Sequence, residues 1–162
     1  MKRVLFYVFT LIFWGIACKT PKASSTPAAG ASQSSTITQG IVGEVTETTG
    51  NQMPMVGAPV PTPKAFKTTV YIYDSTHISK VKQIGTSPLY LTVNTRLVQK
   101  LDTNEAGQFS AALEAGTYSV FVLKGGAFFA NQFDEKNNIG LCRVEVGKQT
   151  RLQISVNVDA SY

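Results

Sequence analysis

The sequence predicts an all-β fold: an antiparallel sandwich of about seven short strands, preceded by a signal peptide and a disordered linker. Two observations lead to this fold class. From residue 40 onward, apolar side chains recur with a period of two, and no stretch of comparable length has the period of a helix. Turn signals that contain glycine separate these alternating segments. Short strands of this kind are expected to pack as two sheets around one apolar core.

The chain begins with a pattern that is typical of exported proteins. Lys2 and Arg3 precede an almost wholly apolar segment, residues 4–14. This segment is too short to cross ~30 Å of hydrocarbon as a helix, so it favours a signal peptide over a membrane-spanning anchor. Small or apolar residues follow at 15–17, and we expect cleavage after Ala17.

A cysteine, Cys18, stands directly after this signal sequence. The arrangement resembles the lipobox of bacterial lipoproteins, although Gly15 stands where that family usually has leucine. The resemblance implies that Cys18 becomes the new N-terminus and carries acyl chains such as palmitate, and two or more chains hold a protein firmly on a membrane. Lys19 follows, where aspartate often marks inner-membrane retention in the family, so the outer membrane of the cell envelope is favoured. The alternatives are an uncleaved anchor and an ordinary signal peptide that leaves Cys18 unmodified.

The chain divides into three segments: the signal peptide at 1–17, a linker at 18–38 and a domain at 39–162. The linker is rich in serine, alanine, threonine and proline, and such sequence buries too little apolar surface to order itself. As a flexible coil it has an end-to-end distance of roughly 25 Å, which would hold the domain off the bilayer. The remaining length is sufficient for one domain.

Charge and cysteine content argue against a nucleic-acid partner and against an internal disulfide. The formal net charge is +5, and removing Lys2 and Arg3 with the signal peptide lowers it to +3. The surplus includes no run of basic residues, so we expect no nucleic-acid partner. Of the two cysteines, lipidation uses Cys18 and leaves Cys142 alone, so no internal disulfide is expected and stability must come from the apolar core.

The first three predicted strands share a simple alternation. Residues 40–47 place isoleucine and valine on one face and mostly polar side chains on the other. Residues 68–73 place valine and isoleucine on one face, with threonine and two tyrosines opposite. Residues 97–103 alternate in the same way. Each segment therefore predicts a strand with one buried face.

Four more strands are predicted in the second half of the chain. Residues 108–113 and 152–158 alternate clearly, and residues 142–146 carry one apolar stripe that includes Cys142. Residues 118–123 are β-branched or aromatic on both faces, which predicts a central strand.

The segments between strands carry turn and loop signals. We expect a bulged hairpin at 103–107, where Gly107 supplies a positive φ, and tight turns at 114–117 and 147–148. Four prolines make residues 50–66 an irregular loop. Residues 74–96 are less regular, with 87–93 a candidate extended segment and 77–83 a candidate helical turn.

The order of these strands and turns resembles that of carboxypeptidase-regulatory-like domains. The resemblance covers about residues 39–158. Its first motif lies at 40–50 and continues with Pro54 and residues 57–58, and the others lie at 102–109, 115–120 and 147–148. It implies a transthyretin-like (prealbumin-like), seven-stranded Greek-key sandwich. The chain departs from the family in two long loops, 50–66 and 124–140, and leaves no room for the zinc peptidase that such domains can accompany.

No set of residues predicts catalysis, a cofactor or a metal site. His77 is the only histidine, and one histidine with a distant Cys142 is not a zinc-binding cluster. Nucleophilic catalysis would need His77 as a base held by a third group, and no nucleophile motif is present. We interpret His77 as a loop residue and Cys142 as a small buried hydrophobe.

Two oxygen-rich segments are interpreted as turns rather than cation sites. Residues 102–107 begin like a calcium loop, but Leu113 stands where the bidentate glutamate belongs. Residues 134–138 offer several oxygens, yet Lys136 lies among them and would repel a cation.

Five aromatic residues form the candidate binding surface: Tyr71, Tyr73, Phe128, Phe129 and Phe133. Exposed aromatic side chains can stack on sugars or fill a partner's pocket. The alternative, which we favour, is that the loop at 124–140 folds back and its phenylalanines cap the sandwich core.

The sequence therefore favours a non-enzymatic lipoprotein of the cell envelope, anchored to its membrane at Cys18 and acting as a structural or protein-interaction module. An alternative is a surface lipoprotein that binds a glycan or a peptide with the loops at 50–66 and 124–140. A third possibility, suggested by the family resemblance, is an accessory subunit of a separate hydrolase.

Overall fold

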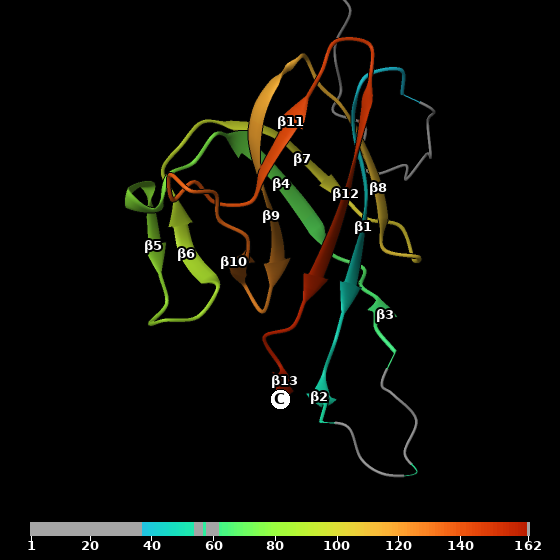
Figure 1. Ribbon diagram of the computed structural model, residues 1–162, viewed down its shortest axis with the longest axis vertical. Helices are drawn as coiled ribbons and strands as arrows, with labels where there is room; N and C mark the ends of the chain where they lie inside the picture. The colour runs from blue at the N-terminus through green and yellow to red at the C-terminus, as the bar shows by residue number, and fades with distance from the viewer. Residues whose placement is uncertain (1–36, 54–56, 58–61, 162) are drawn as a thin grey trace, which may run out of the picture.

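Two β-sheets face each other across an apolar core in the computed structural model, which describes residues 37–53, 57 and 62–161 (Figure 1). The predicted signal peptide, the cleavage position Ala17, the lipidation position Cys18 and nearly all of the linker lie outside the described residues. Within the described part, no helix is long and apolar enough to cross a membrane. The all-β expectation is confirmed.

The smaller sheet is built around β1. Its strands are β1 (Gly40–Glu47), β3 (Lys64–Ala65), β8 (Gln108–Ala112) and β12 (Gln149–Val156). On one side β1 pairs with β12, and on the other it pairs with β8 and then β3. The β1–β12 pairing is parallel from Gly40 opposite Gln149 to Glu47 opposite Val156, so the expectation of a purely antiparallel sandwich is wrong for this pair. The two strands are far apart in sequence, and only adjacent strands joined by a tight turn must run antiparallel.

The larger sheet has seven strands and is antiparallel throughout. Its order is β5–β6–β10–β9–β4–β7, and β11 also pairs with β9. The strands are β4 (Thr69–Asp74), β5 (Val81–Gln83), β6 (Leu89–Val93), β7 (Leu97–Asp102), β9 (Gly116–Lys124), β10 (Ala127–Phe129) and β11 (Leu141–Val144). Strand β9 is central, as its sequence predicts, because β4 lies on one side and β10 and β11 share the other.

Short elements complete the fold. A single 3-10 turn, η1 (Ile78–Lys80), falls within the predicted helical turn, and β6 falls within the predicted extended segment. The predicted irregular loop at 50–66 contains β2 (Gly50–Asn51) and β3, and β2 pairs in parallel with β13 (Ala160–Ser161) below the sandwich (Figure 1). All seven strands predicted from alternation are present, although Val146 lies beyond the end of β11 and is 80% exposed.

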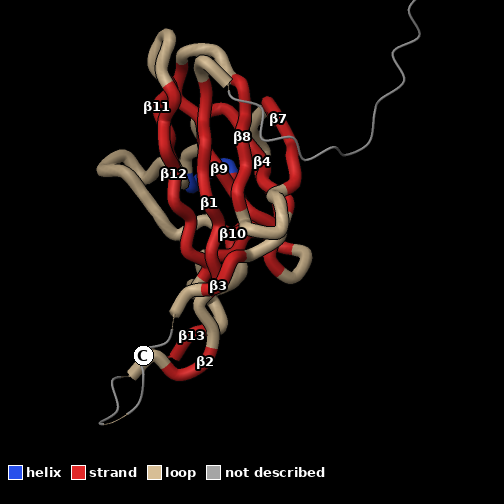
Figure 2. Tube along the Cα trace, turned by 90° about the vertical axis from the view of Figure 1, so that its right-hand side faces the viewer, coloured by secondary structure: helices blue, strands red, loops and turns tan. Residues whose placement is uncertain are grey.

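The turns at 103–107, 114–117 and 147–148 carry the chain from one sheet to the other. Strand β7 belongs to the larger sheet and β8 to the smaller, β9 returns to the larger sheet, and the step from β11 to β12 crosses again (Figure 2). The expected hairpin at 103–107 is therefore wrong, since its flanking strands pair with different partners. Alternation reveals which face of a strand is buried but not which strand lies beside it.

Gly107 fixes the corner between β7 and β8. Its φ is +74°, as the turn prediction requires, and its carbonyl oxygen accepts a 2.8 Å hydrogen bond from the Val45 amide of β1. A Cβ atom at this position would lie 2.2 Å from the Val45 carbonyl oxygen. The corner therefore requires glycine both for its backbone conformation and for its close approach to β1.

The main core lies between the sheets and draws on both. Strands β1, β8 and β12 contribute from the smaller sheet, and β4, β9, β10 and β11 contribute from the larger. Its buried members are Ile41, Val45, Val70, Ile72, Phe109, Ala111, Leu113, Val120, Val122, Phe129, Cys142, Val144 and Val156. Cys142 is 5% exposed within this core, which confirms its interpretation as a buried small hydrophobe.

We expect Gly107→Ala to lower the free energy of unfolding by about 3 kcal/mol or more, since the added methyl group meets the Val45 carbonyl. Gly125→Ala is the matched control, because Gly125 also has a positive φ but has open space around its Cβ position, and it should cost only about 1–2 kcal/mol. Urea unfolding measures both changes. Equal losses in the two variants would contradict the proposed close contact.

Candidate functional site

The aromatic residues of the candidate binding surface divide between two places. Tyr71 and Tyr73 point from β4 to the outer face of the larger sheet, where Phe128 of β10 meets them. The Phe128 ring lies edge-on to both tyrosines, with centroid distances of 5.0 Å to Tyr71 and 6.1 Å to Tyr73. Phe121 of β9 and Tyr90 of β6 extend the cluster, and both are fully buried. We call this group of five rings the outer aromatic cluster.

Two of the expected surface residues do not belong to that cluster. Phe129 is 0% exposed in the main core, because it follows Phe128 on a strand and points to the opposite face of the sheet. It cannot contact a ligand at the surface, and its assignment to a binding surface is corrected. Phe133 is 48% exposed and lies in the irregular segment after β10, where it forms an isolated bridge with Ile139.

A two-residue turn places Phe128 on the outer face. Gly125 and Gly126 both have positive φ, and they join Lys124 of β9 to its partner Ala127 of β10. Two glycines with positive φ form the tight turn that matches the twist of a hairpin. The Gly-Gly pair between apolar runs was the signal that could have predicted β10, which sequence reasoning assigned to a long loop.

Two loop segments cover the outer aromatic cluster. The Ile139 amide donates to the Thr76 carbonyl at 2.8 Å, and the Ile78 amide donates to the Asn137 carbonyl at 3.0 Å. Buried Thr76 is itself held by the Ser119 hydroxyl of β9, which accepts from the Thr76 amide at 2.9 Å. Ile139 packs among the aromatic rings with no exposure. The rings therefore pack beneath these loops as a second core, which leaves Tyr71 and Phe128 only partly accessible.

Asp134 organises the turn within the second loop. One carboxylate oxygen accepts hydrogen bonds from the amides of Lys136 and Asn138 at 2.9 and 2.7 Å, and the other accepts from the Asn138 side chain at 2.9 Å. The Asn138 side-chain amide, followed by the two backbone amides, lowers the pKa of Asp134. The carboxylate is thus engaged by the turn itself, as the surface-turn interpretation predicts.

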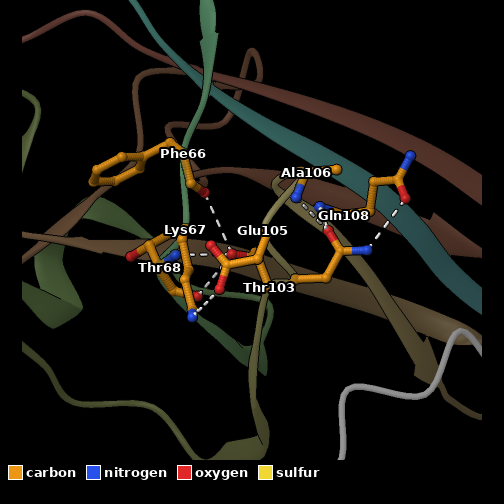
Figure 3. Close-up of polar contacts among 8 residues, drawn as sticks. Phe66, Lys67, Thr68, Thr103, Glu105, Ala106 and Gln108 are labelled. Carbon is orange, nitrogen blue, oxygen red and sulfur yellow. Dashed lines mark hydrogen bonds and ion pairs between the residues drawn. The ribbon is translucent and has the colours of Figure 1, made fainter.

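The corner at 103–107 uses its polar groups in the same way (Figure 3). The Asn104 side-chain oxygen accepts from the amides of Ala106 and Gln108 at 3.0 and 2.8 Å, and the Glu105 carboxylate pairs with Lys67. These contacts support the turn interpretation over a calcium loop.

Thr103 joins the same corner to the residues just before β4. Its hydroxyl oxygen accepts from the Thr68 amide at 2.8 Å and lies 3.1 Å from the Thr68 carbonyl oxygen and 3.3 Å from the Phe66 carbonyl oxygen (Figure 3). Thr103 is 2% exposed, so these bonds satisfy a hydroxyl that burial would otherwise leave without water.

Sequence reasoning missed a charged group at the lower end of the sandwich. Lys124 of β9 bonds to the carboxylate of Glu47 on β1 and, at 2.8 Å, to that of Asp159 after β12. The Lys124 ammonium also lies 5.3 Å from the centre of the Phe66 ring. Hydrogen bonds to Asp159 and then Glu47 raise the pKa of Lys124. These salt bridges link the two sheets. No local sequence pattern could pair Lys124 with Glu47 and Asp159, because the three residues are far apart in the sequence.

The residues considered for nucleophilic catalysis lie apart. The Nδ1 atom of His77 is 2.9 Å from the Ser79 hydroxyl and 3.1 Å from the Ser79 amide, so it caps η1 at the surface. Cys142 lies in the main core, and burial raises the pKa of its thiol. In the residues that the structure describes, no three His, Cys, Asp or Glu side chains come close enough to share a metal ion.

We expect Phe128→Ala to lower the free energy of unfolding by about 2–4 kcal/mol, because Phe128 packs edge-on against three neighbouring rings. Phe133→Ala provides a matched control on an exposed phenylalanine and should change stability by at most about 0.5 kcal/mol. Urea unfolding measures both. A neutral Phe128→Ala would contradict the packing role of the outer aromatic cluster.

The turn at Asp134 should weaken in acid. Its folded-state pKa lies below that of an unfolded chain, so the ionised carboxylate stabilises the turn above about pH 4 and this contribution is lost as the pH falls through the lowered pKa. Hydrogen exchange at the Lys136 and Asn138 amides should accelerate there, beyond the intrinsic pH dependence. In Asp134→Ala these amides should be unprotected at every pH. Unchanged protection in that variant would contradict this account.

Comparisons with known proteins add no relative. No family model matches the chain, and no curated protein or solved structure matches it. The resemblance to carboxypeptidase-regulatory-like domains therefore remains an expectation that rests on the order of strand and turn residues between positions 39 and 158.

Proposed function

We propose that this chain is a lipid-anchored protein of the bacterial cell envelope whose β-sandwich is a non-enzymatic structural or protein-interaction module. The observation that carries the proposal is the cysteine at position 18, which follows a basic start, an apolar segment and small residues. Acyl chains on Cys18 would tether the domain, and the linker at 18–38 would hold it away from the bilayer. Lys19 favours the outer membrane over the inner membrane.

The geometry of the domain is consistent with a module that works through its surface. Cys142 is enclosed in the main core with a raised thiol pKa, and His77 caps a surface turn, so the two do not form a nucleophile and base. In the two oxygen-rich turns, the Asp134 carboxylate accepts hydrogen bonds from backbone amides of its own turn. The Glu105 carboxylate forms a salt bridge with Lys67.

The anchor can be tested on the full chain expressed in a bacterium. We expect mass spectrometry to find an N-terminal peptide that begins at Cys18 and carries acyl chains, and Cys18→Ser should remove that modification and leave the precursor uncleaved. Cys142→Ser is the matched control and should still be processed and acylated. An N-terminal peptide with an unmodified Cys18, or one that begins elsewhere, would overturn the anchor.

A second candidate function is the binding of a glycan or a peptide by the loops at 50–66 and 124–140. The observation that favours it is Phe133, a phenylalanine 48% exposed on the second loop. Glycan-array binding that Phe133→Ala abolishes, with unfolding unchanged, would support this function. Co-purification of an envelope protein from membranes, unaffected by Phe133→Ala, would support the interaction module instead.

A further inference from the structure

Strand β12 forms an edge of the smaller sheet. It pairs with β1 over its whole length, and in the described part of the chain no strand lies on its other side (Figure 2). Neither a break nor a bulge interrupts the β1–β12 register. The backbone groups on the outer side of such a strand can pair with a further strand.

The other edges are shorter or more charged. Strand β5 has three residues, one of them Lys82, and β7 carries Lys100 and Asp102. Strand β8 has five residues, whereas β12 has eight, and its only charged residue is Arg151. Charges, bulges and short length are the usual protection of a sheet edge against pairing, and β12 has little of it.

A shallow hollow runs beside this edge. It is lined on one side by Leu152 and Ile154 of β12, and elsewhere by Val120 of β9 and by residues 130–132 and Gly140 of the segment between β10 and β11. Leu152 and Ile154 are only partly buried, although their strand neighbour Val156 is fully buried. Gln153, whose side chain points to the opposite face, also lines the hollow, so the hollow reaches the backbone edge of β12. A strand added there could pair with β12 and place its own inward side chains against the residues that line the hollow.

We infer that the occupant is a second copy of this chain, joined through antiparallel pairing of the two β12 strands. With Gln153 opposite Gln153 of the second copy, Leu152 of each copy lies opposite Ile154 of the other. These aliphatic side chains face the hollow and would complete the core on both sides of the dyad. The two smaller sheets would become one continuous sheet, and the interface is self-complementary, as a two-fold dimer requires.

The charge of the strand selects this register. Each Arg151 lies opposite Ser155 of the other copy, and the two arginines are separated by four positions, about 13 Å along the strand. A register centred on Arg151 would place two like charges directly opposite each other, and one centred on Leu152 would make the arginines diagonal neighbours. The inference does not depend on acylation of Cys18, and either can fail while the other holds.

Cysteine cross-linking in the full chain tests the dimer in the cell envelope. Gln153→Cys places two thiols opposite each other within the span of a disulfide, and Ala112→Cys, also exposed on the smaller sheet, is the matched control. Because pairing holds the thiols at an effective concentration in the mM range, we expect on the order of tenfold more disulfide-linked dimer from Gln153→Cys. Equal yields from the two variants would overturn the proposal.

The register has its own test. Arg151→Cys and Ser155→Cys should each cross-link no more than the Ala112→Cys control. Co-expressed in equal amounts, the two should cross-link at about half the yield of Gln153→Cys, because half of the dimers that form at random contain one copy of each. Efficient linkage of Arg151→Cys to itself would overturn the register.

Introducing a charge at position 153 tests the same interface without a covalent bond. In sedimentation of the purified full chain, Gln153→Lys should convert a dimer to a monomer, because it places two ammonium groups on the dyad. Mixing it with Gln153→Glu should restore the dimer. An unaltered native chain that sediments as a monomer at high concentration, or a Gln153→Lys variant that stays dimeric, would overturn the proposal.

Discussion

Burial of β9 on both faces is the constraint on which the rest of the structure depends. Residues 119–122 of this strand are all buried, with valines facing the smaller sheet and Phe121 facing the opposite side. A sheet whose central strand is apolar on both faces must be covered twice. The smaller sheet provides one cover, and the loops around Thr76 and Ile139 provide the other.

This double cover decides where a function can be located. Three of the five aromatic residues that suggest a binding surface in the sequence, Tyr71, Tyr73 and Phe128, instead form the second core with Phe121 and Tyr90, and this ring cluster stabilises the loops above it. The surfaces open to partners in the described part of the chain include the outer face of the smaller sheet, the sheet edges and the exposed loop at Phe133. Among them, the β12 edge offers the longest uninterrupted set of backbone groups.

Alternation predicted the strands and their buried faces, because a strand's side chains reveal the face they bury regardless of what covers it. It could not predict the pairing of β1 with β12, more than a hundred positions away, or the crossing between sheets at Gly107. Turn chemistry at Asp134 and Asn104 was predictable, since its contacts are local. The Lys124 group was not, because its partners Glu47 and Asp159 come from distant segments.

The parallel alignment of β1 and β12 also has a mechanical consequence. A tether would enter the sandwich at Gly40, while β12 ends at Val156, at the opposite end of the same strand pair. Tension between these two points pulls the strands past one another in shear, so the hydrogen bonds between them bear the load together rather than breaking one by one. Resistance to such tension is set by the rate of unfolding and not by equilibrium stability.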